Sequence, residues 1–395
     1  MQRSEKYFEV KQGRISDVVA LTAIALQVRV TVLWRGGVGL GKSATANAIA
    51  RSLSLTPVTI YGQRLEPVDV IGLPYIATEQ KTMYATPWWV ALARQQPCLV
   101  FIDELDKAAE DTRRALLELL LAWRVEGESL HPSTRVMGAF NPPECGGRWE
   151  ISEDVINRVL LVDFPCDIDG WTEGLVLGHF DGLSVQNSSQ IPPVDNTTIS
   201  YTLPQVNFQK LPESARKWNA LIGGFIKANP SSLYLFPRDW AGEPFATPRA
   251  WVLAVRLLAG LEAAGYGAAK DERLFRLALE GAVGVVATDE FLEWMRKQDL
   301  IPPKQLLSNP KLLPNSLSAL YLNLYNCAQH VVSNPHLVSM LSGIVSELER
   351  RRKLDLLTEF LRLVVSGLRS NGHTDALKQL EGILRGRKIV KFILA

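Results

Sequence analysis

The sequence contains few residues that could cross-link it or hold a structural metal. Of its 395 residues, four are cysteine and five are histidine. No pair of cysteines has Cys-x-x-Cys spacing, and no histidines group beside them; the cysteines are Cys98, Cys145, Cys166 and Cys327. Disulfide frameworks and zinc sites are recognised by such spacing. The sequence therefore argues against both.

A long hydrophobic run is also missing. The longest nearly apolar stretch, 18–34, is broken by Gln27 and Arg29, and it falls short of the roughly 20 residues that a membrane-spanning helix needs. Residues 1–14 are polar and lack the apolar core of a signal peptide. We therefore expect no membrane span and a location in the reducing cytoplasm.

The sequence also lacks an excess of charge of either sign. The 43 basic and 41 acidic residues give a formal net charge of +2, too small to bind nucleic acid or anionic membrane by bulk electrostatics. Apolar residues make up 47% and charged residues 21%, which is typical of folded, soluble proteins. The length corresponds to two or three domains at roughly 150 residues each.

Between residues 15 and 164, short apolar runs alternate with helical patterns. The runs that predict strands are 28–34, 55–62, 97–104, 134–140 and 159–164. Apolar residues recur at helical spacing in the segments 15–27, 43–53, 89–95 and 111–123. This alternation predicts an α/β fold, a three-layer domain built on a parallel sheet.

The rest of the sequence is helical in pattern, with one polar interruption. Residues 184–205 are rich in Ser, Asn, Gln, Pro and Thr, a composition that predicts a surface insertion. Helical spacing resumes at 214–228 and 248–298, and the IPPK sequence from Ile301 marks a boundary. The predicted parts are an α/β domain over 1–237, an α-helical segment over 238–300 and a helical C-terminal region over 301–395.

A glycine-rich motif follows the first predicted strand and precedes a predicted helix. Residues 36–43, GGVGLGKS, fit the P-loop pattern G-x-x-x-x-G-K-[ST] in that context. Glycines let backbone N–H groups turn toward phosphate oxygens, and the helix N-terminus adds partial positive charge. We expect Lys42 to reach the β- and γ-phosphates and Ser43 to ligate magnesium. The predicted phosphate-binding residues are Gly36, Gly37, Val38, Gly39, Leu40, Gly41, Lys42, Ser43 and Ala44.

Two adjacent carboxylates end another apolar strand. Asp103 and Glu104 follow the four apolar residues 99–102. Because an unpaired carboxylate at the edge of a core is costly to desolvate, adjacent acids there indicate a function. Beside a P-loop, we assign Asp103 to magnesium and Glu104 to the attacking water. The predicted ligands are ATP and Mg2+.

With these motifs the chain resembles the AAA+ ATPases, and within them the MoxR-like branch, over roughly residues 15–298. Similar proteins place a sensor 1 asparagine after a sheet strand, which matches Asn141. They have an arginine finger where Arg158 stands, and their sensor 2 helix resembles the segment ATPRAW that contains Arg249. The segment 66–74, with residues 84–87 after it, looks like the insertion that marks this branch. The resemblance also implies that 238–300 is a lid.

Asn141 and Arg158 each have an ordinary structural alternative, whereas the position of Arg249 favours a function. Asn141 precedes a proline and could simply form a turn. Arg158 could be a surface arginine in a weak ion pair. Arg249 lies at a helix start, where the helix dipole disfavours a cation unless an anion such as phosphate is near. Whether Arg249 serves the nucleotide of its own subunit or of a neighbour stays open.

The resemblance implies a magnesium-dependent ATPase that assembles as a ring, with a hexamer expected, and remodels a protein partner. Similar proteins are typically paired with a von Willebrand factor A domain protein, which is the partner implied here. The main alternative is a nucleic-acid translocase or restriction-type motor, or a GTPase. Weak net charge and the lack of an aromatic-basic groove argue against nucleic acid. A scaffold that binds ATP with negligible turnover is a third possibility.

Overall fold

The computed structural model describes residues 13–78, 81–125, 128–147, 152–176, 201–268, 270–296 and 301–385. The chain divides into two compact units, one made of Met1–Leu211 with Leu233–Thr288 and the other of Pro212–Ser232 with Asp289–Ala395. Most of the predicted polar insertion, residues 184–200, lies outside the described residues. The predicted boundaries of the helical segment 238–300, near residues 237 and 300, remain predictions.

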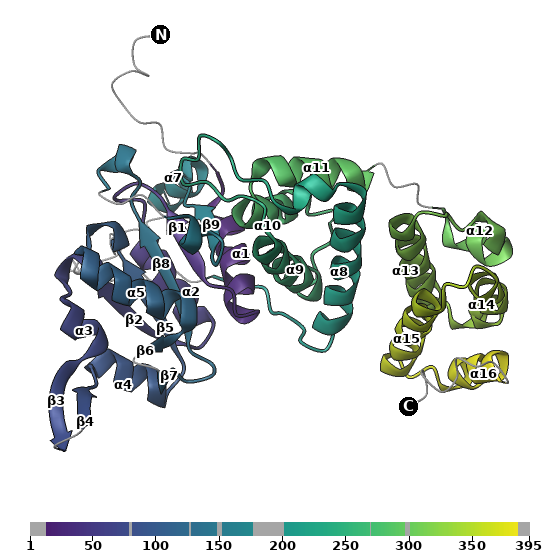
Figure 1. Cartoon of the computed structure of the whole chain (residues 1–395), viewed down its shortest axis with the longest axis horizontal. Coiled ribbons are helices and arrows are strands. Elements are labelled where there is room, and N and C mark those ends of the chain that lie inside the picture. The colour runs from purple at the N-terminus through teal and green to yellow at the C-terminus, as the bar shows by residue number, and fades with distance from the viewer. Residues whose placement is uncertain are drawn as a thin grey trace, which may run out of the picture. The chain divides into compact units, whose positions relative to one another are not determined.

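A five-stranded parallel sheet forms the centre of the first unit (Figure 1). Its order is β2-β5-β8-β1-β9. The strands are β1 (Val32–Arg35), β2 (Thr56–Tyr61), β5 (Cys98–Asp103), β8 (Arg135–Phe140) and β9 (Leu160–Asp163). The predicted α/β fold with a parallel sheet is confirmed.

The first unit also contains helices, some packed on the sheet and others that come after its last strand along the chain. They are α1 (Ile15–Gln27), α2 (Lys42–Ser52), α3 (Pro67–Ile71), α4 (Trp88–Gln95), α5 (Glu110–Ala122), α6 (Glu153–Ile156), α7 (Ile168–Val176), α9 (Pro248–Ala263) and α10 (Glu272–Val283). Contacts of α1, α2, α4 and α5 with the strands bury the sheet, and every residue of β5 is buried. A strand covered on both faces needs the continuous apolar sequence from which it was predicted.

The first strand begins later than predicted. Residues from Val28 were expected in it, but Val28 donates its N–H to the Ile24 carbonyl at 3.0 Å and so closes α1. Arg29 then adopts a left-handed conformation with φ 59°. The chain therefore turns before β1 starts at Val32, because β-branched residues alone do not fix where a strand begins.

A separate hairpin interrupts the chain between the second and third strands of the main sheet. It consists of β3 (Leu73–Thr78) and β4 (Lys81–Ala85), which pair antiparallel, and Figure 1 shows it standing away from the main sheet. Gly72 enters it with φ 97° and ψ 165°. A Cβ at Gly72 would lie 2.2 Å from the Ala85 carbonyl oxygen. The hairpin thus connects the two segments that resemble a family insertion, 66–74 and 84–87, and the sequence patterns did not predict it.

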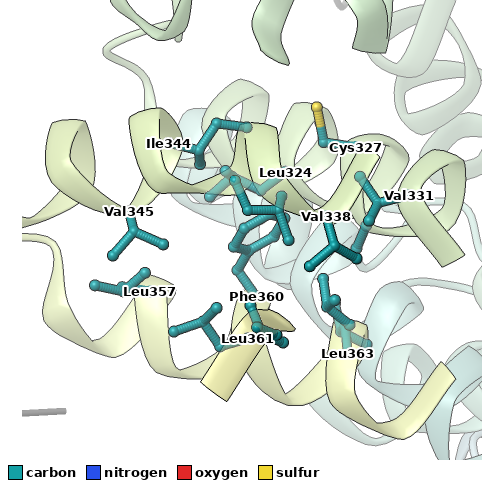
Figure 2. Close-up of a cluster of buried hydrophobic side chains, with 14 of the residues drawn as sticks. Leu324, Cys327, Val331, Val338, Ile344, Val345, Leu357, Phe360, Leu361 and Leu363 are labelled. Carbon is teal, nitrogen blue, oxygen red and sulfur yellow. The ribbon is translucent and has the colours of Figure 1, made fainter. Parts of the chain in front are cut away.

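The second unit is helical and has its own apolar core. Besides α8 (Leu211–Ala228) and most of α11 (Val285–Arg296), its helices are α12 (Pro303–Ser308), α13 (Leu317–Ser333), α14 (Leu341–Arg350), α15 (Leu354–Ser370) and α16 (Thr374–Leu384). Figure 2 shows Phe360 at the centre of the core, with side chains such as Leu324 and Ile344 around it. The prediction that the chain beyond residue 301 is helical is confirmed for the described residues. No helix in the described ranges is both long and apolar enough to cross a membrane.

Candidate functional site

The turn between β1 and α2 has open space around two of its glycines. Gly39 and Gly41 have φ angles of 80° and 88°, which side chains rarely tolerate, and a Cβ at either would meet no atom within 4 Å. Gly41 is the N-cap of α2 and offers no side-chain hydrogen bond to the helix start. The first turn of α2 contains no acidic residue. Free amides and an uncompensated helix dipole together favour an anion here.

Lys42 is the first residue of α2, and only 8% of it is exposed. Its ammonium donates hydrogen bonds to the carbonyl oxygens of Gly36 at 2.8 Å and Gly37 at 2.7 Å, and to Asn141 Oδ1 at 3.1 Å. Burial lowers the pKa of Lys42, and the negative charge of nearby Asp103 opposes that shift. An added anion would stabilise the charged form of this lysine.

The carboxylates at the end of β5 lie beside the start of α2. One oxygen of Asp103 accepts a hydrogen bond from the Ser43 hydroxyl, and the other accepts from the Glu104 N–H at 2.9 Å. Glu104 has a left-handed backbone with φ 52° and ψ 43°, and its Oε1 pairs with Lys107 at 2.5 Å. Glu104 Oε2 is buried without a hydrogen-bond partner among the described residues. A buried, unsatisfied carboxylate oxygen needs an additional donor, such as water.

Asn141 follows β8 and connects this group to another buried acid. Its backbone N–H donates to Asp106 Oδ1 at 2.9 Å, and its side-chain amide reaches the same oxygen at 3.4 Å. Asn141 and Asp106 are 3% and 1% exposed. These bonds leave the side-chain oxygen of Asn141, Oδ1, facing the Lys42 ammonium. Sequence reasoning missed Asp106, although an acid three residues after Asp103 could have suggested it.

The order of the sheet explains why these segments meet. β5, β8 and β1 are neighbours and run parallel, so their carboxyl ends share one edge. Each strand passes directly into one part of the site: β5 into Glu104, β8 into Asn141 and β1 into the glycine turn. Crevices at the carboxyl ends of parallel strands are common ligand sites in α/β folds.

Arg158 and Arg249 are placed differently. The Arg158 side chain is 41% exposed and pairs with Asp154 at 3.5 Å. Arg249 is exposed at the second position of α9. Across the described residues, no hydrogen bond or ion pair joins either arginine to Lys42, Ser43 or Asp103. The chain thus brings together the glycine turn, the acid pair and Asn141, but not these two arginines.

The residues present fit a magnesium-nucleotide complex. Ser43 and Asp103 supply two adjacent oxygen donors, and Mg2+ commonly takes its remaining ligands from substrate phosphates and water. No group of three or more His, Cys, Asp or Glu residues suited to a metal occurs within the described ranges. A metal at this edge would therefore depend on the phosphates, and the unsatisfied Glu104 oxygen leaves a place for water beside them.

Comparison with known proteins agrees with this geometry. Residues 32–147 match the model of the family described as ATPase family associated with various cellular activities (AAA). That range starts at β1 and includes the glycine turn, the acid pair and Asn141. With the parallel sheet, it assigns this part of the chain to the AAA-type P-loop fold.

Two further comparisons were made. No curated protein sequence matches this chain. Among solved structures, it is similar to one described as "a putative ATPase" from Cytophaga hutchinsonii ATCC 33406, with a TM-score of 0.45 and 15% sequence identity. The match covers 72% of this chain and 90% of that one.

Proposed function

We propose that this protein is a magnesium-dependent ATPase of the MoxR-like branch of AAA+ proteins, which hydrolyses ATP to remodel a protein partner. The observation that carries the proposal is that two hydrogen-bonded pairs, Lys42 with Asn141 and Ser43 with Asp103, meet at the start of α2. Glu104 lies beside them and donates its N–H to Asp103. These groups supply the positive charge, the metal ligands and the water-binding oxygen that phosphoryl transfer to water requires.

The glycine turn and Lys42 would bind the triphosphate. The open amides of the turn and the N-terminus of α2 favour phosphate oxygens, and the buried ammonium of Lys42 gains a counter-charge when phosphate arrives. Ser43 and Asp103 would hold Mg2+, which neutralises negative charge on the phosphates when bound. Lys42 and these oxygen donors converge at one edge of the sheet.

Glu104 and Asn141 would position the attacking water. Lys107 occupies Oε1 of Glu104, so Oε2 is left to accept a hydrogen bond from water. Asn141 is held by Asp106 and directs its side-chain oxygen, Oδ1, toward Lys42. As a general base, Glu104 would contribute about 10²–10⁴ to the rate.

Arg158 would act on the nucleotide of a neighbouring subunit. Its exposure and its weak pairing with Asp154 leave it able to contact a second chain, and it has no bond to its own phosphate-binding residues among those described. An arginine supplied in this way stabilises transition-state charge, with effects of about 10³–10⁵ in well-studied enzymes. This role implies a ring, for which a hexamer is the proposed form, with Arg249 as a second phosphate-sensing residue.

The β3–β4 hairpin is the proposed contact with the protein partner. Its apolar side chains are unusually exposed, with Ile76 at 81%, and Trp88 beside it at 70%. Trp89, in contrast, is buried and donates its indole N–H to the Asp69 carbonyl at 3.0 Å. Exposed apolar side chains grouped on one element favour a protein-binding surface. A von Willebrand factor A domain protein is the partner implied by the family resemblance.

Phosphate release by the purified protein tests the enzymatic part. With ATP and Mg2+ we expect turnover that falls at least about 100-fold in Glu104→Gln, whereas ATP binding persists. Glu110→Gln, which removes an exposed carboxylate of α5, is the matched control and should keep full activity. Equal background rates in all three proteins would reduce the site to a nucleotide-binding scaffold.

Two additional assays separate the alternatives. Faster release from GTP than from ATP would reassign the nucleotide. A salt-dependent gel shift with duplex DNA, together with nucleotide-stimulated unwinding, would favour a nucleic-acid motor over protein remodelling. For the partner, Glu104→Gln with ATP should capture a purified von Willebrand factor A domain protein, and Ile76→Asp in that background should weaken the capture.

A further inference from the structure

An arginine directly before the glycine turn bridges two other segments of the first unit. Arg35 is the last residue of β1, and its Nε donates to Asp163 Oδ1 at 2.6 Å. Its two terminal nitrogens donate to the two carboxylate oxygens of Glu243 at 2.8 and 3.1 Å. Burial alone would lower the pKa of Arg35, but the bonds to Asp163 and Glu243 outweigh it and raise the pKa. The guanidinium is therefore held in one orientation by two carboxylates.

Glu243 begins a short segment, residues 243–247, that leads into α9. The side chain of Thr247 caps α9 by accepting the Ala250 N–H at 3.1 Å. The Thr247 hydroxyl also donates to Asn157 Oδ1 at 3.0 Å, and Asn157 directly precedes Arg158. The 243–247 segment is thus tied at one end to the strand before the glycine turn and at the other end to the residue before Arg158.

Close packing does not fix this segment on every side. A hollow of about 430 Å³ lies against it, lined by Arg35, Asp163, Glu243 and mostly apolar residues that include Phe236 and Phe245. The bonds from Arg35 cross the polar side of this hollow. Phe245 and Ala246 are buried, and the Ala246 carbonyl accepts the Leu235 N–H at 3.0 Å, so packing and a backbone bond hold the middle of the segment. The Glu243 side chain at its exposed end lacks such packing, and the bonds from Arg35 set its position.

The Arg35–Glu243 pair is better suited to orientation than to stability. The Glu243 side chain is 58% exposed, and exposed ion pairs contribute little to stability. The contact is nevertheless bidentate, and a guanidinium fork on a carboxylate fixes direction as well as distance. A lysine could supply the charge but not this geometry.

We propose that Arg35 and Glu243 are positioning residues that hold the start of α9, and with it Arg249, in a fixed place relative to the phosphate-binding turn. The effect of this positioning on ATP hydrolysis rests on the function proposed above, whereas the positioning itself does not. Movement at the glycine turn would pass through Arg35 and Glu243 to α9, and through Thr247 to the segment before Arg158.

The positioning is tested by a distance measurement that requires no hydrolysis. Spin labels are placed at Arg51 of α2 and Val252 of α9, both exposed, after Cys145 and Cys166 are replaced by serine. We expect Glu243→Ala to broaden the distribution of label separations relative to the unsubstituted sequence. An unchanged distribution would overturn the proposal.

The matched control is Glu280→Ala. Glu280 lines the same hollow and pairs with Arg276 at 3.2 Å within α10, so its removal deletes a carboxylate of similar setting without touching the 243–247 segment. The label distribution of this variant should stay narrow. Broadening as large as in Glu243→Ala would show a general loosening around the hollow and would also overturn the proposal.

Steady-state kinetics tests the link to the reaction. We expect Glu243→Ala and Arg35→Lys to lower kcat by about 10-fold, as small misplacements of catalytic groups do, while the KM for ATP stays within about 2-fold and Glu280→Ala changes neither. A broadened label distribution with unchanged kcat would refute the role in catalysis. If the unsubstituted protein hydrolyses no ATP, the proposed function fails, and the label separations still decide the positioning.

Discussion

At the scale of single residues, Asp106 shows how the site depends on a group outside the predicted motifs. Asp106 is buried and accepts both the backbone and side-chain N–H groups of Asn141 at one oxygen. Its other oxygen, Oδ2, is buried without a hydrogen-bond partner among the described residues, so the contacts of this carboxylate with Asn141 run through Oδ1. The two bonds to Asp106 fix the orientation of the Asn141 side chain. Without them, Asn141 Oδ1 would be free to turn away from Lys42.

Replacing Asp106 should damage both stability and activity. We expect Asp106→Ala to lower the free energy of unfolding by about 1–3 kcal/mol, because the buried Asn141 N–H loses its acceptor. ATP turnover should fall more than this destabilisation explains, by about 10-fold, since Asn141 is no longer oriented. Urea denaturation and phosphate release measure the two effects.

Asp106→Asn serves as the control for this prediction. Its side-chain oxygen can still accept from Asn141, so it should keep more of the stability and activity than Asp106→Ala. Equal turnover in Asp106→Ala and the unsubstituted protein, with both folded, would show that Asn141 needs no such support.

The sequence could suggest some of these neighbours but not others. Lys42 and Asp103 stand in motifs whose local context, a strand followed by a turn, already predicts where the backbone points. Asp106 stands outside these motifs. Its position three residues after Asp103 places it near the site, but nothing in the sequence pairs it with Asn141, 35 residues away. The sequence likewise does not predict that Arg35 bridges two segments, since its partner Glu243 lies 208 residues further along the chain. Contacts between distant residues depend on strand order, which one sequence does not specify.

At the scale of elements, the apolar runs predicted the main sheet because its central strands β5, β8 and β1 are buried almost throughout. The β3–β4 hairpin follows another rule. Its exposed faces carry apolar residues such as Ile76 and Tyr84, so it lacks the alternation of apolar and polar residues that identifies a half-buried strand. The pattern that hid the hairpin also marks it as a candidate binding surface.

Gly72 gives a direct test of the hairpin. Its φ of 97° and ψ of 165° lie in a region nearly restricted to glycine, where another residue costs about 1–3 kcal/mol, and an added Cβ would collide with the Ala85 carbonyl. We expect Gly72→Ala to displace the hairpin, abolish stimulation of ATP turnover by the protein partner and leave basal turnover within about 2-fold.

Gly382→Ala is a suitable comparison, because a Cβ at Gly382 would meet no atom within 4 Å. It should behave like the unsubstituted protein in both assays. Partner stimulation that survives in Gly72→Ala, with hairpin displacement verified by protease sensitivity near residue 79, would remove the hairpin from the proposed partner site.

At the scale of the whole molecule, the residues assigned to the reaction all belong to one unit. Lys42, Asp103, Asn141, Arg158 and Arg249 lie within Met1–Leu211 and Leu233–Thr288. The second unit has a separate core around Phe360 and none of the predicted nucleotide-binding residues. The Arg158 side chain is exposed and pairs with Asp154 alone among the described residues, so the proposed role of Arg158 would need a second copy of the chain.

Mixing two inactive variants tests that requirement. Lys42→Ala should abolish nucleotide binding, and Arg158→Ala should abolish the contribution to the neighbouring site, so neither variant alone should turn over ATP. In a ring of head-to-tail contacts assembled from equal amounts of both, about one interface in four joins an intact Lys42 to an intact Arg158. We therefore expect phosphate release to recover to roughly a quarter of the rate of the unsubstituted protein, if sites act independently. The doubly substituted chain mixed with either single variant should recover nothing, because no interface then contains both groups. Mixed rings that form, as shown by differently tagged subunits co-purifying, yet stay inactive would exclude the action of Arg158 across a subunit interface.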